Sequence, residues 1–446
     1  MRTSTLLGIL ASWAAIATQS PPAEARLSSS ASESFLSTRY DLVNPSSIHP
    51  DLTPQYTAKH STQLPHRLKS PRINRRSNSN TTTTTITNIT SSFQLQFTCR
   101  NSASCSYAQT TFIHATQRLS QILSLPAQVI ISATFESFCI ANAADCGSST
   151  LGLAAPASFH TWSAVAGNAL GVDTAYSYPS ALAKQLAPND TAWGPNGTVG
   201  SSVVDIFARF NADFPWWFTT QSSSPPAATN HAPYDFEQIV LHELYHGLGF
   251  ISSWYPWTGP GLLLPSYPVT DPNTGNYVGL GAPYIFNKWM VDDVASTWYY
   301  TYSDQILAAA STVNAPDYAS WVDGFKNTSG FQIAASLFNN VTTTNGRTLL
   351  MYPLSQGGPA DSDTSPYYSD YGFVMLYTPS NFSTGSSISH VDATFYDGSS
   401  EFLMRPFATS YTALDDYVPM AETGPIGEIT IAVLRALGYK TILDVI

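Results

Sequence analysis

The sequence predicts an α+β fold with a mixed β-sheet, and three observations lead to this prediction. Residues Phe93–Phe97 alternate strictly between apolar and polar side chains, which is the pattern of a half-buried strand. Residues 128–135 contain several β-branched side chains and indicate a second strand. Residues 112–123, which end before Pro126, and residues 236–246 instead place apolar side chains at helical spacing.

Composition and charge narrow the classes of function. The chain has 446 residues, enough for one large domain or two to three ordinary ones. Charged residues make up 11% of the chain, far below the usual share of about a quarter, and this profile favours a secreted protein over a cytosolic one. The net charge of −11 argues against nucleic acid as a partner, because phosphate binding requires a basic face.

The N-terminus predicts export from the cell. Arg2 is followed by an apolar run, Leu6 to Ala17, and then by small residues, as in a secretory signal peptide covering residues 1–25. A buried N-terminal helix is the alternative interpretation. No other stretch approaches ~20 continuous apolar residues, so we expect a secreted, extracellular protein without an integral membrane segment.

A basic leader precedes an acidic body. Residues 1–76 hold 9 of the 19 Lys and Arg residues and 4 of the 30 Asp and Glu residues, which leaves 10 basic against 26 acidic residues afterwards. Residues 26–90 are rich in Ser, Pro and Thr without sustained periodicity, so we expect order to begin near Phe93. Arg75-Arg76 is either a processing site, which would make residues 26–76 a propeptide, or part of a basic linker.

These features divide the chain into successive regions. We expect a signal peptide (1–25), a propeptide (26–76), a Thr/Ser/Asn-rich linker (77–92), an N-terminal catalytic part (93–254), an insertion (255–380) and a C-terminal part (381–446).

The cysteines and glycosylation sequons fit an oxidising compartment. All four cysteines fall within 48 residues, which predicts two disulfides in one of three pairings among Cys99, Cys105, Cys139 and Cys146. A zinc site built from these cysteines is the competing interpretation, but no CxxC pair exists. A glycosylated surface is indicated by seven Asn-x-Ser/Thr sequons, which begin at Asn80, Asn88, Asn189, Asn196, Asn327, Asn340 and Asn381.

The segment 235–250 carries the most specific motif. Asp235 is a good N-cap, and glycines at 247 and 249 are expected to end a helix from about Phe236 to His246. On such a helix His242 and His246 lie on one face, because residues four apart are separated by little more than one turn. Two imidazoles so placed can bind one zinc ion, while Glu243 on the neighbouring side can act as a general base. This is the HExxH signature of the zincins.

A catalytic zinc ion requires three protein ligands, and the third must come from elsewhere in the chain. No glutamate occurs between Glu243 and Glu401, and His390 is the only histidine after His246. Elimination therefore points to His390, with Asp392 as the best substitute ligand. Asp271 and Asp292 are further substitutes.

The surroundings of His390 resemble a known family, the secreted zinc metallopeptidases of the leishmanolysin-like, metzincin-related kind. The shared motifs are the HExxHxxGF run at 242–250, the Ser-Ile-Ser-His-Val-Asp segment at 387–392 and the Leu-Met-Arg-Pro segment at 403–406. The resemblance implies a zincin-like fold with a large insertion and a C-terminal subdomain. It also implies that Met404 lies beneath the metal as the Met-turn, with Met351 in a second Leu-Met-x-Pro run as a rival.

Other candidates are weaker. Asp392 could orient a ligand imidazole from the second coordination shell or cap a local turn. His160 and His231 precede the motif and are more typical of surface or core histidines than of ligands.

Together these features predict a secreted zinc endopeptidase with one catalytic Zn²⁺ that acts on protein or peptide substrates, with Glu243 as general base on a zinc-activated water. A secreted zincin-fold protein that binds or adheres without turnover is the alternative. A zinc hydrolase acting on carbohydrate or ester is a third interpretation.

Overall fold

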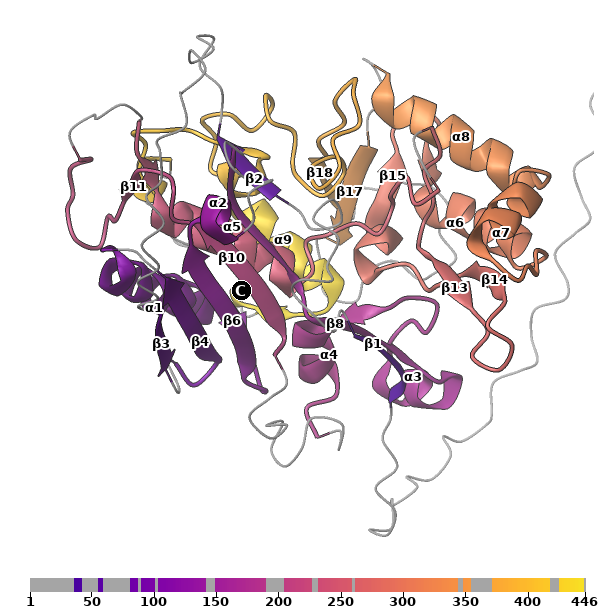
Figure 1. Cartoon of the computed structure of the whole chain (residues 1–446), viewed down its shortest axis with the longest axis horizontal. Coiled ribbons are helices and arrows are strands. Elements are labelled where there is room, and N and C mark those ends of the chain that lie inside the picture. The colour runs from indigo at the N-terminus through magenta and orange to yellow at the C-terminus, as the bar shows by residue number, and fades with distance from the viewer. Residues whose placement is uncertain are drawn as a thin grey trace, which may run out of the picture. The chain divides into compact units, whose positions relative to one another are not determined.

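The computed structural model describes residues 36–41, 55–58, 81–86, 90–100, 103–141, 149–189, 204–226, 232–258, 261–343, 348–353, 371–417 and 425–444. All of these residues belong to one unit that spans residues 34–446 (Figure 1). The predicted signal peptide, the Arg75-Arg76 pair, Cys146 and His231 lie outside the described residues.

The central element is a mixed sheet, as the sequence predicts. Within the described residues its strands run in the order β19 (Phe407–Ala408), β2 (Gln55–Ala58), β7 (Thr150–Pro156), β10 (Ile206–Asn211), β6 (Val129–Glu136), β4 (Phe93–Arg100) and β3 (Thr81–Ile86). Strands β4, β6 and β10 are parallel, whereas β7 is antiparallel to β10. Side chains of β4 alternate between buried and half-buried positions, which confirms the pattern at Phe93–Phe97.

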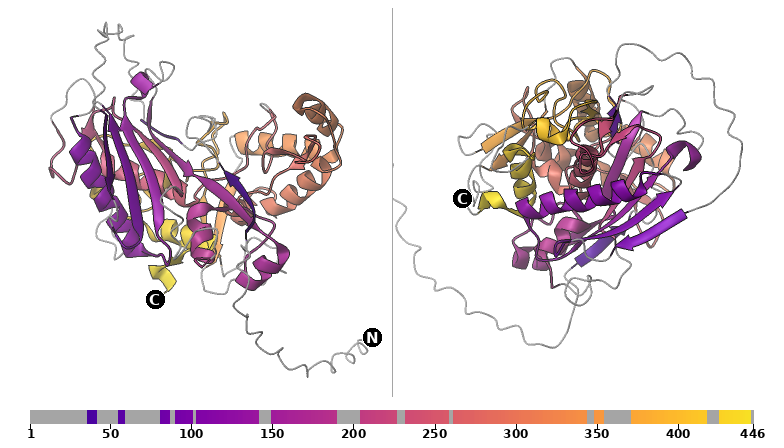
Figure 2. Two further views of the ribbon diagram at one scale, coloured as in Figure 1. Left: turned by 60° about the horizontal axis from the view of Figure 1, so that its bottom comes forward. Right: turned by 90° about the vertical axis from the view of Figure 1, so that its left-hand side faces the viewer.

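Two helices, α1 (Cys105–Ile122) and α5 (Phe236–Leu248), pack against this sheet (Figures 1 and 2). Aromatic rings fill the space between the helices and the strands. The ring of Phe112 on α1 lies 5.1 Å from Phe210 and 5.9 Å from Phe236, the first residue of α5. The ring of Phe236 also lies 5.2 Å from Phe135 of β6. Because interiors are closely packed, these contacts fix where α5 begins relative to the sheet.

Further elements of the first part surround the sheet. They are β5 (Leu123–Ser124), α2 (Phe138–Ala141), β8 (Ser158–Trp162), α3 (Ala164–Leu170), β9 (Tyr178–Pro179), α4 (Ser180–Leu186), β11 (Trp216–Trp217) and β12 (Tyr234–Asp235). A buried ion pair between Lys184 Nζ and Asp205 Oδ2 at 2.6 Å connects α4 to the start of β10. A second sheet in the described part of the chain has the order β1-β8-β9, with β1 at Leu36–Asp41.

The predicted insertion contains its own sheet and helices. A described four-stranded sheet has the order β16-β15-β17-β18, and the helices α6, α7 and α8 lie beside the hairpin β13–β14 at the orange end of Figure 1. The bounds are β13 (Pro268–Thr270), β14 (Tyr277–Leu280), η5 (Ile285–Trp289), β15 (Met290–Asp292), β16 (Thr297–Trp298), α6 (Tyr299–Ala310), α7 (Tyr318–Phe325), α8 (Ser329–Thr342), β17 (Thr348–Pro353) and β18 (Tyr371–Met375).

The C-terminal part returns to the first sheet. Its elements are η6 (Phe402–Met404), β19, η7 (Leu414–Asp416), α9 (Glu428–Leu437), β20 (Lys440–Thr441) and η8 (Ile442–Asp444). Glu401 accepts hydrogen bonds from the backbone N–H groups of Ile429 and Thr430, at 3.2 and 2.9 Å, and so holds the first turn of α9. Strand β20 pairs with β5, which follows α1.

The expectation that order begins near Phe93 is wrong. Strands β1, β2 and β3 all precede Phe93, and β1 and β2 lie inside the segment expected to be a propeptide. Each is short, and each pairs with a strand of the body. Strands β1 and β2 pair with β8 and β7, which lie far along the chain, whereas β3 pairs with the next strand, β4. Local composition does not reveal such pairings.

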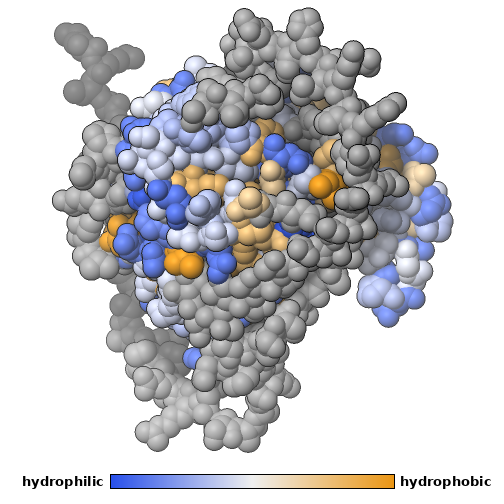
Figure 3. Space-filling model, turned by 60° about the vertical axis from the view of Figure 1, so that its left-hand side comes forward, coloured by the Kyte–Doolittle hydropathy of each residue, from blue (hydrophilic) through white to orange (hydrophobic). Residues whose placement is uncertain are grey.

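The described cysteines are disulfide-bonded. Cys99 and Cys105 form a disulfide, and Cys139 is also disulfide-bonded, in keeping with the disulfides predicted from the sequence. The sequon residues Asn189, Asn327 and Asn381 are exposed. Within the described residues no helix has both the length and the apolar character needed to cross a membrane. On the face drawn in Figure 3, the hydrophobic residues form small groups with hydrophilic and pale residues between them.

Candidate metal centre

Helix α5 carries the HExxH motif and is fixed at both ends. Asp235 is its N-cap, as predicted, and its Oδ1 accepts a hydrogen bond from the N–H of Glu237 at 2.9 Å. The helix ends at Gly249, whose φ of 117° favours glycine. Gly247 does not end the helix, contrary to expectation. It lies inside the last turn, where a Cβ atom would come within 2.3 Å of Ile206 of β10, so a glycine allows close packing on the sheet.

Three histidines converge at the buried face of this helix. The Nε2 atoms of His242 and His246 are 3.0 Å apart, and each lies 3.2 Å from Nε2 of His390. These separations match the edge of about 3–4 Å expected for ligands of one tetrahedral zinc ion with bonds of ~2.1 Å. The three histidines are also the one group of possible metal ligands found among the described residues.

The second nitrogen of each ring is bound to a main-chain carbonyl. Nδ1 of His242 lies 2.7 Å from the oxygen of Leu403, Nδ1 of His246 lies 2.7 Å from that of Phe250, and Nδ1 of His390 lies 2.9 Å from that of Ser386. A carbonyl oxygen can only accept, so each Nδ1 carries the proton and donates it. Each Nε2 therefore presents its lone pair to the other two.

Burial keeps these rings neutral. All three side chains are fully buried, and this burial lowers the pKa of His242 and His246 well below the usual value, with a further lowering from the neighbouring rings. Burial lowers the pKa of His390 to about 4. Three lone pairs that face one another without a proton between them repel, and a cation removes that repulsion. Because a set of three imidazole nitrogens suits zinc, the residues fit the ion expected from the sequence.

His390 reaches the site from a tightly bonded turn. The backbone N–H of Tyr377 donates to the carbonyl of His390 at 2.8 Å, and the N–H of Ile388 donates to the carbonyl of Tyr377 at 2.8 Å. Ile388 has a φ of 55°, which is rare for a β-branched residue. Such strain persists only where the surrounding structure enforces it. Ile388 stands in the chain between Ser386 and His390, and the carbonyl of Ser386 orients the imidazole of His390.

The segment expected to be the Met-turn lies against the histidines. Met404 is fully buried in η6, and its carbonyl accepts a hydrogen bond from the N–H of Val391 at 2.9 Å. The preceding carbonyl, that of Leu403, is the one that orients His242. Met351, the rival, lies in strand β17 opposite Phe373 and not in a turn.

Glu243 is also fully buried, and strand β7 lies directly against it. A Cβ atom built on Gly152 would lie 3.0 Å from Cγ and 3.1 Å from Oε1 of Glu243. A side chain at position 152 would therefore press on this carboxylate and on Ile239, and the carboxylate would have to shift by a few tenths of an ångström to make room.

The contact at Gly152 leads to a first prediction. If Glu243 is the general base expected from the sequence, Gly152→Val displaces its carboxylate and lowers the expected peptide hydrolysis by about 10²-fold, the order of loss for a catalytic group moved by about 1 Å. The zinc content should stay unchanged, because the side chains nearest to a Cβ atom at position 152 are those of Glu243 and Ile239 and not those of the three histidines. Hydrolysis and bound zinc are measured on the same preparation, and a fully active variant would contradict the role given to this contact.

The remaining candidates lie elsewhere or act differently. Asp392 does not orient an imidazole: its Oδ1 accepts from the N–H groups of Thr394 and Phe395, at 2.9 and 2.8 Å, so the turn-capping alternative holds. Asp271 and Asp292, the other substitute ligands, accept backbone hydrogen bonds within turns of the insertion. His160 is buried in β8, where Nε2 lies 3.0 Å from Oγ of Ser158.

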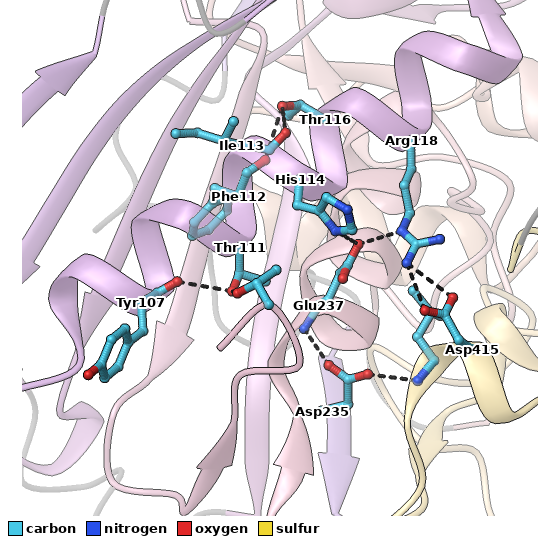
Figure 4. Close-up of polar contacts among 12 residues, drawn as sticks. Tyr107, Thr111, Phe112, Ile113, His114, Thr116, Arg118, Asp235, Glu237 and Asp415 are labelled. Atoms are coloured by element: carbon cyan, nitrogen blue, oxygen red, sulfur yellow. Dashed lines mark hydrogen bonds and ion pairs between the residues drawn. The ribbon is translucent and has the colours of Figure 1, made fainter. Parts of the chain in front are cut away.

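A network of charged groups holds the start of α5 (Figure 4). Oε1 of the buried Glu237 lies 2.8 Å from Nδ1 of His114 and 2.6 Å from Nε of Arg118, and Arg118 also pairs with Asp415 at 3.0 Å. Asp235 Oδ2 accepts from the N–H of Leu414 at 2.7 Å. Burial raises the pKa of Asp235 to about 7. These contacts connect α1, α5 and the C-terminal part of the chain.

The network predicts a pH effect on stability. The hydrogen bond with Glu237 raises the pKa of His114 above its ordinary value of 6.5. A group whose pKa is higher in the folded chain contributes stability that is complete below 6.5 and is lost as the pH rises through the folded pKa. His114→Gln should therefore reduce the free energy of unfolding below pH 6.5 and reduce it less at alkaline pH. Denaturant unfolding of both proteins across this range tests the prediction, and an effect that grows with pH would contradict it.

Several positioning groups could not be found by sequence reasoning. The carbonyls of Leu403, Phe250 and Ser386 belong to the main chain, so no side chain marks them. Gly152 also carries no motif, and its role becomes visible only when β7 and α5 are packed together.

The chain shares sequence with other proteins over most of its length. It is 28% identical over 288 residues to the Schizosaccharomyces pombe protein named "Uncharacterized protein PB7E8.01", an alignment that covers 59% of this chain and 46% of that protein. The chain thus spans less than half the length of this relative. No solved structure matches the chain. The profile of the SPBPB7E8-like family matches residues 49–265 and 276–444, which include all three histidines and Glu243. The chain therefore belongs to the SPBPB7E8-like family.

Proposed function

We propose that the protein is a secreted zinc-dependent endopeptidase with a zincin-like fold, related to the leishmanolysin-like metallopeptidases. One observation carries the proposal: three neutral imidazoles present their Nε2 lone pairs to a single point, and each is held there by a main-chain carbonyl. An arrangement of this kind has no evident structural purpose without a cation, because it brings lone pairs together in a buried place.

The residues assign the parts of the reaction. His242, His246 and His390 hold the zinc ion, which when bound supplies a Lewis acid that polarises the scissile carbonyl and makes a water molecule more acidic. Glu243 accepts a proton from the attacking water on its carboxylate and passes it to the nitrogen of the leaving amine. The water oxygen forms the new bond to the carbonyl carbon and the C–N bond breaks, so the products are a carboxylic acid and an amine.

Two features of the chain favour catalysis over simple binding. Glu243 is kept as a fully buried carboxylate beside the histidines, although desolvation of a carboxylate is costly. A protein that only binds or adheres has no use for a base at this position. Strand β7 also runs directly past Glu243, so the main chain of the sheet borders the carboxylate.

Hydrolysis assays with chelation test this function. The purified, secreted form should hydrolyse casein, lose this activity with a zinc chelator and regain it when zinc is added back. Ester and glycoside substrates, incubated under the same conditions, separate peptide hydrolysis from the other zinc hydrolases. Casein hydrolysis that persists without metal, or chelator-sensitive hydrolysis of glycosides alone, would overturn the proposal.

A further inference from the structure

The segment that follows helix α5, residues 250–253, contacts two of the three histidine-bearing parts of the metal centre. The carbonyl of Phe250 accepts the Nδ1–H of His246 at 2.7 Å. Two residues later, the backbone N–H of Ser252 donates to Oγ of Ser389 at 3.1 Å, and Ser389 directly precedes the third histidine in the chain. A shift of this segment would therefore disturb two imidazoles together.

A single side chain from the predicted insertion, that of Asn287, holds this segment. Its Oδ1 accepts from Oγ of Ser252 at 3.0 Å and from the backbone N–H of Ser253 at 3.2 Å. Its Nδ2 donates to Oγ of Ser253 at 2.6 Å, and that hydroxyl donates to the carbonyl of Pro265 at 2.6 Å. Asn287 is only 2% exposed. Because water is excluded, removal of the amide would leave buried polar groups of residues 252 and 253 without these partners.

The backbone of Asn287 is itself fixed to the first part of the chain. Its N–H donates to the carbonyl of Tyr284 at 2.9 Å, at the start of η5. The residues on both sides of Tyr284 pair with Ser177: the N–H of Ser177 donates to the carbonyl of Pro283 at 2.8 Å, and the N–H of Ile285 donates to the carbonyl of Ser177 at 3.0 Å. The amide of Asn287 therefore extends from a rigid support toward the segment 250–253.

We propose that Asn287 is a positioning residue of the metal centre, through which the insertion sets the orientation of His246 and of the turn that carries His390. This inference rests on the proposed zinc site, and it adds a residue from outside the three segments that supply the ligands. While the amide holds residues 252 and 253, the Phe250 carbonyl stays where the Nδ1–H of His246 can donate to it. The Nε2 lone pair of that ring is then directed at the point where the three rings meet. Without the amide the carbonyl can move away, and the ring becomes a weaker ligand.

A second buried asparagine provides the matched control. Asn211 is also 2% exposed, and it makes a similar set of hydrogen bonds. Its Oδ1 accepts from the N–H groups of Phe138 and Asp213, at 3.3 and 3.1 Å, and its Nδ2 donates to the carbonyl of Thr150 at 3.1 Å. These partners differ from the carbonyls that orient the imidazoles. Asn211→Ala and Asn287→Ala should therefore cost comparable stability and differ only at the metal centre.

The test compares the full chain with Asn287→Ala, Asn211→Ala and Ser252→Ala. Ser252→Ala is a milder change on the same path, because it removes the hydroxyl that donates to Asn287 and leaves the amide in place. Three quantities are measured for each chain. Competition with a zinc indicator gives the zinc affinity, and the visible absorption of the cobalt(II)-loaded chain reports the geometry of the ligands. Denaturant unfolding of the metal-free chain gives its stability.

We expect Asn287→Ala to lower the zinc affinity by about tenfold or more, the order found when the partner of a metal ligand is lost. Its cobalt absorption should also change, and Ser252→Ala should change it in the same direction. Asn211→Ala should lose a similar amount of stability but keep the affinity and the absorption of the wild type. A merely structural role for Asn287 would make the two asparagine variants alike in all three measurements.

The outcomes separate this inference from the proposed function. If Asn287→Ala binds zinc as tightly as Asn211→Ala and its cobalt absorption matches that of the wild type, the inference fails while the zinc site stands. If Asn287→Ala does not fold, Ser252→Ala decides, and wild-type affinity and absorption in that chain overturn the inference. If the wild type itself binds neither zinc nor cobalt, the proposed function fails, and the role of Asn287 fails with it.

Discussion

Glu243→Gln is expected to lower peptide hydrolysis by about 10²-fold or more, because a general base typically contributes this much. The amide side chain has nearly the same shape, so it can lie against Gly152 as the carboxylate does, but it cannot accept the proton from water. Zinc should remain bound, because the three imidazoles provide the protein ligands. Hydrolysis of casein and zinc per chain, measured on one preparation, test both parts.

The matched control for this variant is Glu136→Gln. Glu136 lies at the end of β6 and pairs with Arg100 and Arg209, at 3.0 and 3.3 Å, so its loss removes an acidic group without touching the histidines. We expect this variant to hydrolyse casein at nearly the wild-type rate. Near wild-type activity of Glu243→Gln would remove Glu243 from the mechanism.

His390→Ala is expected to abolish tight zinc binding and, with it, hydrolysis. The loss of affinity should exceed the roughly 10–100-fold that follows when only the partner of a metal ligand is removed. His242 and His246 remain on α5, but two ligands do not complete a catalytic zinc site. Competition of the purified variant with a zinc indicator measures the change in affinity.

Asp392→Asn serves as the control for His390→Ala. This residue is two positions away and was the strongest substitute ligand in the sequence. Because the asparagine oxygen can still accept from Thr394 and Phe395, the turn should persist. Zinc retained by His390→Ala but lost from Asp392→Asn would exchange the roles of the two residues.

The parts of the fold that the sequence predicts are those with a strong local signal. The alternation at Phe93–Phe97 and the capped, apolar pattern of α5 each arise from side chains that contact a single core, and both are confirmed. The sequence also predicts that His390 joins His242 and His246, because no other histidine follows the motif. The three side chains do converge. A metal role for the three residues stays a prediction.

The parts that sequence reasoning missed depend on distant partners. Strands β1 and β2 are short, and their backbones are satisfied by β8, β7 and β19, which lie far along the chain. The choice between two roles for Asp392 likewise depended on which groups the fold places beside it. The orienting partners of the imidazoles are carbonyls, which every residue possesses, so no residue type could mark them.

The most direct measurement of the central claim is a zinc titration of the metal-free, secreted chain, read by casein hydrolysis. The three-histidine site predicts that activity rises from near zero and reaches a plateau at one zinc ion per chain. Hydrolysis that is already complete before zinc is added, or absent at every zinc concentration in a chain freed of its leader, would contradict the claim that these histidines form a catalytic zinc centre.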